Sequence, residues 1–207
     1  MTIRLRYPEF APEGIATLRS TEHYLNATTA LPAVLLELVR LRVSLQNGCE
    51  FCAGHHTNEL RKHHEPETRI EALRDWANSD AFTARERAAL AWADSVTDIQ
   101  TRRAADEDYA AASSFFHDKD LVDLTLAIAS INAWNRMSIA FRGEWDPGRA
   151  AHRPEPDIAA DTIASSFAKE AAPPATTAPS PSQATPAHED EPTQDVIDSD
   201  GGKVAQD

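Results

Sequence analysis

Residues 1–153 carry a helical pattern of apolar side chains almost from end to end, and no stretch alternates between apolar and polar residues as a half-buried strand would. Ala, Leu, Glu and Arg dominate, and the apolar positions recur with a period near 3.6 residues. The segment after Pro32 shows this most clearly, with one stripe formed by Leu35, Leu38, Leu41 and Leu45. We therefore predict an all-α fold of about seven helices.

Local signals set the limits of these helices. Gly48 ends one of them, because glycine is the usual residue where a helix stops. Pro66 suits a first helical turn, and Thr83 with Glu86 has the spacing of a capping box. The last helix is apolar on more than one face, so we expect it near the centre. The expected helices cover residues 12–26, 33–47, 49–64, 66–77, 84–97, 105–117 and 120–142.

The composition changes sharply after residue 153. Residues 154–207 hold eight of the 13 prolines but only one of the 14 aromatic residues, with 11 acidic and two basic side chains. Such a segment has too little apolar surface to offset the entropy lost on ordering it. We predict one helical domain over residues 1–153 and a largely disordered acidic tail over 154–207, with at most a weak helix at 157–170.

Charge and motifs exclude several classes of protein. The net charge is −13, most of it from the tail, whereas nucleic-acid binding needs a basic surface. No run approaches the length of a membrane span, and no signal peptide is evident. No GxGxxG or GxxxxGK[ST] motif is present. We expect a cytoplasmic protein that binds neither nucleic acid nor membrane, and that carries no flavin, haem, nicotinamide or metal.

The two cysteines form the most informative motif. Cys49 and Cys52 are three residues apart and His56 follows four residues later, so all three share one face of a helix. The sulfur atoms can therefore approach disulfide distance beside an imidazole. A helix start lowers the pKa of a thiol, and the thiolate is the form that attacks peroxides and disulfides. These residues suit thiol redox chemistry.

Glu37 lies among leucines on the preceding helix, 12 residues before Cys49. A carboxylate in such a run lies at a bundle edge or is buried with a partner. If the two helices pack antiparallel, Glu37 comes level with His56 and can orient or polarise its ring, directly or through water. The reading of Glu37 as an ordinary ion-paired residue beside Arg40 and Arg42 stays open.

The segment ELVRLRVSLQNGCEFCAGHHT resembles the core motif of the AhpD-like alkylhydroperoxidase and carboxymuconolactone decarboxylase family. In that family a Glu precedes a CxxC by about a dozen residues and a His follows it, and Glu37, Cys49, Cys52 and His56 occupy these positions. The resemblance extends over about residues 5–145. It implies an all-helical fold, trimers or hexamers, and a hydroperoxide-reducing cycle with a proton relay from Glu through His to the cysteines, re-reduced by an external dithiol.

The sequence leaves open which cysteine attacks first. The spacing of His56 from Cys52 and the family resemblance favour Cys52, whereas the start of the helix favours Cys49. The sequence also departs from the family at two places. Phe51 stands where some members carry a second histidine, and the pattern assigns no role to His55.

Other functions also remain open at this point. The four cysteine and histidine side chains of residues 49–56 could bind zinc, although adjacent histidines point about 100° apart on a helix. Glu37 and His56 alone could serve a decarboxylase-like acid–base reaction, with the cysteines as bystanders. A non-enzymatic redox sensor or adaptor that binds partners through its acidic tail is the third alternative. The polar residues Asn132, Asn135 and Arg136 are expected in structural or interface roles.

Overall fold

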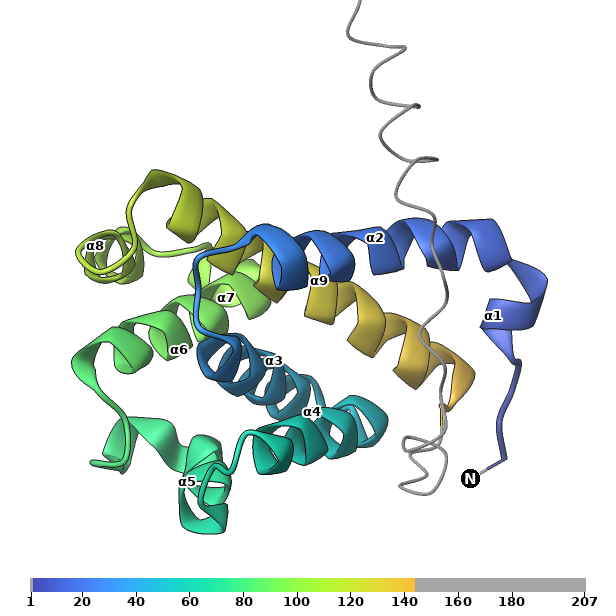
Figure 1. Ribbon diagram of the computed structural model, residues 1–207, viewed down its shortest axis with the longest axis horizontal. Helices are drawn as coiled ribbons and strands as arrows, with labels where there is room; N and C mark the ends of the chain where they lie inside the picture. The colour runs from blue at the N-terminus through green and yellow to red at the C-terminus, as the bar shows by residue number, and fades with distance from the viewer. Residues whose placement is uncertain (1, 144–207) are drawn as a thin grey trace, which may run out of the picture. The chain divides into compact units, whose positions relative to one another are not determined.

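The computed structural model of the protein describes residues 2–143, and this part is entirely helical (Figure 1). Its elements are α1 (Tyr7–Phe10), α2 (Pro12–Thr28), α3 (Ala33–Asn47), α4 (Glu50–Lys62), α5 (Glu67–Ala72), the 3-10 helix η1 (Leu73–Asn78), α6 (Ala84–Thr97), α7 (Ile99–Arg102), α8 (Asp106–Ser113) and α9 (Asp118–Phe141). The predicted all-α fold is confirmed. The predicted domain limit at 153, the tail 154–207 and the weak helix at 157–170 lie outside the described residues.

The helix limits differ from the expected ones in a few places. The helix expected over residues 66–77 is divided into α5 and η1, because the backbone of Asp75 leaves the helical region at φ −131° and ψ 47°. The short helices α1 and α7 were not predicted, since four residues are too few to show a period. The capping box is confirmed, with the Thr83 hydroxyl accepting from the Glu86 amide and the Glu86 carboxylate accepting from the Thr83 amide.

Helix α3 forms the centre of the bundle and packs against α4, α6 and α9 (Figure 1). Nine of its 15 residues are buried, six of them apolar, so the helix is covered on most of its faces. On one side Leu36, Val39 and Val43 join the larger apolar cluster with residues of α6 and α9. On the other side Leu38 and Leu41 join a smaller cluster with residues of α4, η1 and α6. The long helix expected at the centre, α9, covers one side of α3.

The turn between α3 and α4 fixes how the two helices meet. Gly48 has a φ of 68°, in the left-handed region that favours glycine. Its amide donates to the Leu45 carbonyl at 3.3 Å, and the Cys49 amide donates to the Ser44 carbonyl at 2.9 Å. This pair of bonds is a Schellman motif, which satisfies the last carbonyls of α3. It turns the chain so that α4 packs back along α3 and begins at the first cysteine.

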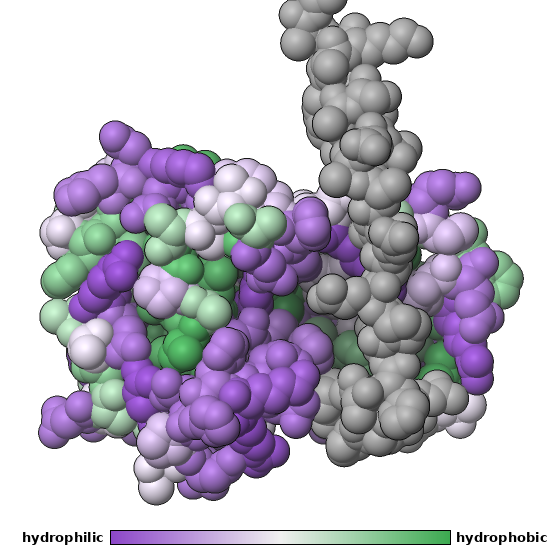
Figure 2. All heavy atoms as spheres, in the orientation of Figure 1, coloured by the Kyte–Doolittle hydropathy of each residue, from purple (hydrophilic) through white to green (hydrophobic). Residues whose placement is uncertain are grey.

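The surface in the view of Figure 2 is hydrophilic over most of α4 and α5, while apolar residues are visible in a recess near α6. Long apolar helices such as α9 are interrupted by polar residues that find partners inside the bundle. Within residues 2–143, no helix is both long and apolar enough to cross a membrane.

Candidate active site

Cys49 is the N-cap residue of α4, at the point where the chain leaves the Gly48 turn. Its sulfur accepts a hydrogen bond from the backbone amide of Cys52 at 3.3 Å. Both cysteines are free thiols, and both are buried in the larger apolar cluster. A sulfur that accepts at a helix N-terminus is favoured in its charged form, because the amides and the helix dipole stabilise negative charge there.

Helix α9 supplies polar partners for the two thiols. The side chain of Ser138 hydrogen-bonds both cysteines, and that of Asn135 hydrogen-bonds Cys52. Asn135 is held in turn, because its amide donates to the Ser44 hydroxyl at 3.1 Å and its oxygen accepts from Asn47 at 2.8 Å. Residues of three helices therefore fix the orientation of the groups that face the cysteine pair.

These contacts push the pKa values of the two thiols apart. The hydrogen bond from the Cys52 thiol lowers the pKa of Cys49, whereas burial raises that pKa. Further hydrogen bonds from the Cys52 amide, the Ser138 side chain and the Phe51 amide lower it again, and the pKa of Cys49 is about 7. The bond that the Cys52 thiol donates to Cys49, together with burial, raises the pKa of Cys52. One thiolate beside one protonated thiol is the expected state near neutral pH, with the charge on Cys49.

Glu37 is buried on α3 and binds His56 of α4 directly. The Oε2 atom of Glu37 lies 2.8 Å from Nδ1 of His56, and its Oε1 atom accepts from Nη1 of Arg40 at 2.7 Å. Arg40 is itself buried and donates through Nη2 to Glu22 at 2.6 Å. Glu37 is thus a buried, ion-paired carboxylate with its two oxygen atoms bound to different partners.

The charge state of Glu37 decides what it can do. Burial raises the pKa of Glu37, but the hydrogen bonds and positive charge of His56 and Arg40 outweigh burial and lower that pKa to about 2. An ionised carboxylate only accepts hydrogen bonds, so Nδ1 of His56 carries the proton between them. In the neutral form of the ring, the other nitrogen, Nε2, is the one that can accept a proton from a reactant.

His55 lies beside His56, with the two rings edge to face and their centroids 4.9 Å apart. Burial, together with the charge of His56, lowers the pKa of His55 to about 4. His55 is therefore neutral near pH 7, and it adds no positive charge to the site.

The structure brings the four predicted site residues together as two pairs, one at the start of α4 and one between α3 and α4. Cys49 contacts Cys52, and Glu37 contacts His56. Within the described part of the chain, no direct hydrogen bond joins His56 to either thiol. A proton that passes between the pairs needs a water molecule or an oxygen of the substrate as the link.

The sequence did not predict the roles of two residues that contact the predicted site. Asn135 was expected to be structural, and it both braces the α3–α4 turn and binds Cys52. Ser138 was not singled out, and neither was Glu22, which binds Arg40 behind Glu37. The signal for Asn135 and Ser138 is their position in the apolar run of α9, where a polar side chain must find a buried partner.

A cleft of about 500 Å³ opens beside the cysteine pair. It is lined by Cys49 and by residues of α3, α4 and η1, whereas Cys52, Glu37 and His56 do not line it. Of the four predicted site residues, Cys49 is therefore the one that lies at the cleft. Both cysteines are nearly fully buried, with Cys49 2% and Cys52 4% exposed, so the position of the cleft, and not the exposed area of the side chains, distinguishes them.

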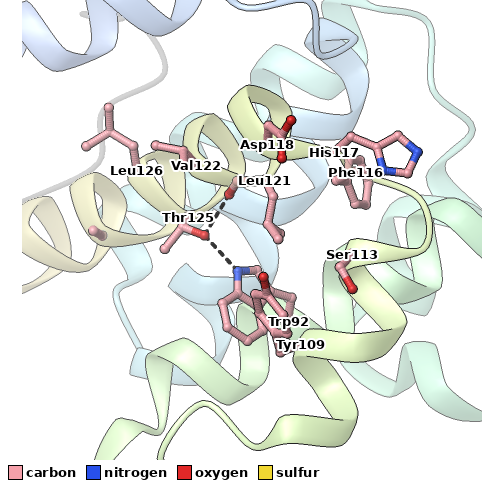
Figure 3. A pocket seen from close by; sticks show the side chains of 11 residues that line it. Trp92, Tyr109, Ser113, Phe116, His117, Asp118, Leu121, Val122, Thr125 and Leu126 are labelled. Atoms are coloured by element: carbon pink, nitrogen blue, oxygen red, sulfur yellow. Dashed lines mark hydrogen bonds between the residues drawn. The ribbon is translucent and has the colours of Figure 1, made fainter.

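A second hollow, of about 550 Å³, lies elsewhere on the bundle (Figure 3). Its wall is mainly apolar, and the Trp92 indole donates to the Thr125 hydroxyl at 2.9 Å across it (Figure 3). None of the four predicted site residues lines this hollow. Its lining includes hydroxyl groups and His117 but no thiol, so the cysteines remain the candidate active site.

No group of three or more His, Cys, Asp and Glu side chains that could hold a metal ion occurs among residues 2–143. Cys49 and Cys52 contact each other, while His56 binds Glu37 through Nδ1, so the two thiols and the imidazole do not form one cluster.

Comparison with known proteins agrees with the fold and the position of the motif. The sequence profile of the carboxymuconolactone decarboxylase family matches residues 12–95, which include all four predicted site residues. The uncharacterized protein YdfG of Bacillus subtilis is 39% identical over 141 residues, which cover 68% of this chain and 95% of YdfG. The chain belongs to the carboxymuconolactone decarboxylase family. Its AhpD-like membership, expected from the motif, is confirmed.

Solved structures of this family's fold include proteins with different descriptions. ATU0492 of Agrobacterium tumefaciens, a protein of unknown function provisionally described as the antioxidant defence protein AhpD, is 33% identical with a TM-score of 0.68, over 70% of this chain and 99% of that one. The debrominase Bmp8 is 20% identical with a TM-score of 0.60, over 69% of this chain and 76% of that one. The likeness to Bmp8 shows the fold alone.

Proposed function

We propose that this AhpD-like protein reduces hydroperoxides through a dithiol–disulfide cycle of Cys49 and Cys52. The observation that carries the proposal is the contact between the two thiols, in which one sulfur is stabilised as a thiolate and the other keeps its proton. A thiolate attacks a peroxide, and a neighbouring thiol converts the resulting sulfenic acid into a disulfide.

The structure favours Cys49 as the attacking sulfur, although the family resemblance favours Cys52. Cys49 has the lowered pKa and lines the cleft. Its thiolate attacks the terminal oxygen of the hydroperoxide, the O–O bond breaks, and the alkoxide leaves with the electron pair. The alkoxide takes a proton to become the alcohol, and Cys49 becomes a sulfenic acid.

Cys52 completes the oxidation. Its sulfur attacks the sulfenic acid of Cys49, a disulfide forms, and the hydroxyl group leaves as water with the proton from Cys52. Across both steps one hydroperoxide is reduced to an alcohol and water while two thiols are oxidised. An external dithiol must then return two electrons, as the sequence analysis expects.

In this mechanism Glu37 is a positioning residue and His56 is the group that moves the proton. Glu37 stays ionised and holds Nδ1 of His56, so Nε2 is free to take the proton of Cys49 and return it to the alkoxide, through a bridging water. This refines the relay that the family resemblance implies, because a carboxylate with a pKa of about 2 does not itself accept a proton near neutral pH.

The test is peroxide consumption by the full chain with several dithiol donors, in wild type and in Cys49→Ser and Cys52→Ser. Both variants are expected to lose turnover, because neither can form the disulfide. A sulfenic-acid trap should label Cys49 in Cys52→Ser and leave Cys49→Ser unlabelled. Full turnover in Cys52→Ser would reject the cycle, and labelling of Cys52 in Cys49→Ser would reverse the two roles.

The contact between Glu37 and His56, which involves neither thiol, favours a second candidate function. This pair could serve a decarboxylase-like reaction, with His56 as the acid–base group. Decarboxylation of a lactone that persists in a Cys49→Ser and Cys52→Ser double variant would establish this function in place of the thiol cycle.

A further inference from the structure

The cleft beside Cys49 combines a reactive sulfur with cationic side chains. Besides Cys49, its charged lining residues are Glu50 of α4, Arg61 of α4 and Arg74 of η1. The remaining walls are small or apolar side chains and the Gly48 turn. Its volume of about 500 Å³ is that of a site for a small molecule, and far exceeds what hydrogen peroxide needs.

The two arginines differ in whether their guanidinium groups are already ion-paired. Arg61 forms a bidentate pair with Glu67, through Nε at 2.5 Å and Nη2 at 2.8 Å. The guanidinium of Arg74, in contrast, has no hydrogen-bond or ion-pair partner among the described residues, and only its backbone carbonyl accepts a bond, from Arg42. Arg74 is exposed and therefore available to a ligand anion.

We propose that this cleft binds the small dithiol that re-reduces the Cys49–Cys52 disulfide, and that Arg74 selects a dithiol bearing a carboxylate. The proposal rests on the cycle proposed above. A guanidinium pairs with a carboxylate through parallel hydrogen bonds, which fixes orientation as well as affinity. Glu50, an acidic residue on the same cleft, opposes the binding of an anion.

The cleft also determines which sulfur the donor meets. A donor thiolate attacks the sulfur of Cys49, the residue of the pair that lines the cleft. The protein S–S bond breaks, its electron pair leaves on Cys52, and Cys52 takes up a proton. In the mixed disulfide Cys49 carries no charge, so the Cys49 thiolate no longer raises the pKa of Cys52, and Ser138 and Asn135 hydrogen-bond the departing sulfur. The second donor thiol then attacks the mixed disulfide, releasing Cys49 and the oxidised donor.

The test measures this half-reaction by itself. The full-length protein is oxidised with diamide, and the disulfide is reduced by 2,5-dimercaptoadipate, a dithiol diacid whose oxidised form closes into a six-membered ring, or by its neutral dimethyl ester. Alkylation and mass measurement at timed intervals give second-order rate constants. We expect Arg74→Gln to slow reduction by the diacid about fivefold at low salt and to leave the ester rate unchanged. Glu50→Gln should raise the diacid rate, and both effects should fade at high salt.

Arg102→Gln is the matched control, because it also removes one positive charge but lies outside the cleft. The proposal is overturned if Arg74→Gln slows reduction by the diacid and by the ester equally, or slows neither. It is also overturned if Arg102→Gln changes the diacid rate as much as Arg74→Gln does. Thermal melting of each variant separates these outcomes from a folding defect. Diamide forms the disulfide without peroxide, so this test does not depend on the proposed peroxidase activity. If that activity is absent, both thiols will remain alkylatable after treatment with peroxide, while the diamide experiment can still succeed.

Discussion

At the scale of single residues, the site holds two buried negative charges, each stabilised by hydrogen bonds from neighbouring side chains. Cys49 holds a negative charge that Cys52 stabilises, and Glu37 holds another that Arg40 and His56 stabilise. In both cases burial works against ionisation, and directed hydrogen bonds outweigh it. The site therefore depends on individual donors, and removal of one donor should shift a titration that can be measured.

Cys52→Ala tests this for the thiolate. The change removes the thiol that donates to Cys49, so the pKa of Cys49 should rise from about 7 toward its ordinary value. The measurement is the pH dependence of alkylation of Cys49 by iodoacetamide, whose rate follows the thiolate fraction and rises as pH passes the pKa. Ser138→Ala should shift the same curve upward by less. An inflection that stays near pH 7 in Cys52→Ala would show that another group sets the charge of Cys49.

Glu37→Gln tests the second charge. The folded-state pKa of Glu37 is lowered to about 2 from 4.5, so its ionised form stabilises the fold above its unfolded pKa. That stability is lost as pH falls through the folded pKa. We expect Glu37→Gln to lower the free energy of unfolding by about 3 kcal/mol at pH 7, and the deficit to shrink between about pH 4.5 and 2. Urea unfolding across this pH range measures it.

Glu67→Gln is the control for that experiment, since Glu67 is exposed and pairs with Arg61 at the surface. It should change the free energy of unfolding far less than Glu37→Gln does, because solvent screens an exposed ion pair. Glu37→Gln should also reduce turnover by about 10- to 100-fold, because His56 loses the group that orients it. Wild-type stability and activity in Glu37→Gln would show that Glu37 is an ordinary ion-paired residue.

At the scale of elements, the Gly48 turn sets the position of α4 on α3, and α9 supplies the groups that complete the site. The turn is tied to α9, because the Asn47 amide donates to Asn132 at 3.0 Å and to Asn135 at 2.8 Å. The same α9 asparagine that braces the turn also contacts Cys52. The turn and the site are therefore joined by one hydrogen-bonded network.

Gly48→Ala tests the turn without changing any packing. No atom would contact an added Cβ within 4 Å, so the cost comes from the φ of 68° alone. We expect a loss of about 1–2 kcal/mol in the free energy of unfolding. Gly14→Ala is the matched control, because Gly14 lies within α2 and its Cβ would also meet nothing within 4 Å. That change should stabilise the protein by about 0.5–1 kcal/mol. A Gly48→Ala protein as stable as wild type would contradict this account of the turn.

The sequence predicts elements with strong local signals and misses those that depend on tertiary contacts. Gly48, Pro66 and the Thr83 capping box mark helix limits because glycine, proline and capping hydroxyls act on their own backbone. The break at Asp75 and the short helix α7 have no such signal. Glu37, Cys49, Cys52 and His56 follow from spacing, whereas the contacts of Ser138 and Arg40 depend on the packing of α9 and α2 against α3.

At the scale of the whole molecule, α9 carries apolar side chains on its outer surface. Val122 is 64% exposed and Leu126 is 37% exposed, and both line the hollow of Figure 3. The sequence analysis predicts a homotrimer or hexamer, and we propose that this part of α9 lies in the subunit contact. Apolar side chains exposed together are typical of such contacts.

Light scattering measures this prediction on the full chain. Wild type should have the mass of a trimer or hexamer, and a Val122→Glu and Leu126→Glu double variant should have a lower mass, because two charges would be buried unpaired in the contact. Ile99→Glu, which changes an exposed apolar residue of α7 that does not line this hollow, should leave the assembly intact. A wild-type mass of 22.7 kDa at micromolar concentration would contradict the prediction.

The most direct test of the thiol cycle is to count alkylatable cysteines before and after one equivalent of hydroperoxide. The account predicts that the reduced protein takes up two alkyl groups, since both cysteines are free thiols. After peroxide it should take up none, with an intact mass two hydrogen atoms lower and a peptide joining Cys49 to Cys52. If both cysteines remain alkylatable after prolonged exposure to peroxide, the proposed chemistry of this site is wrong.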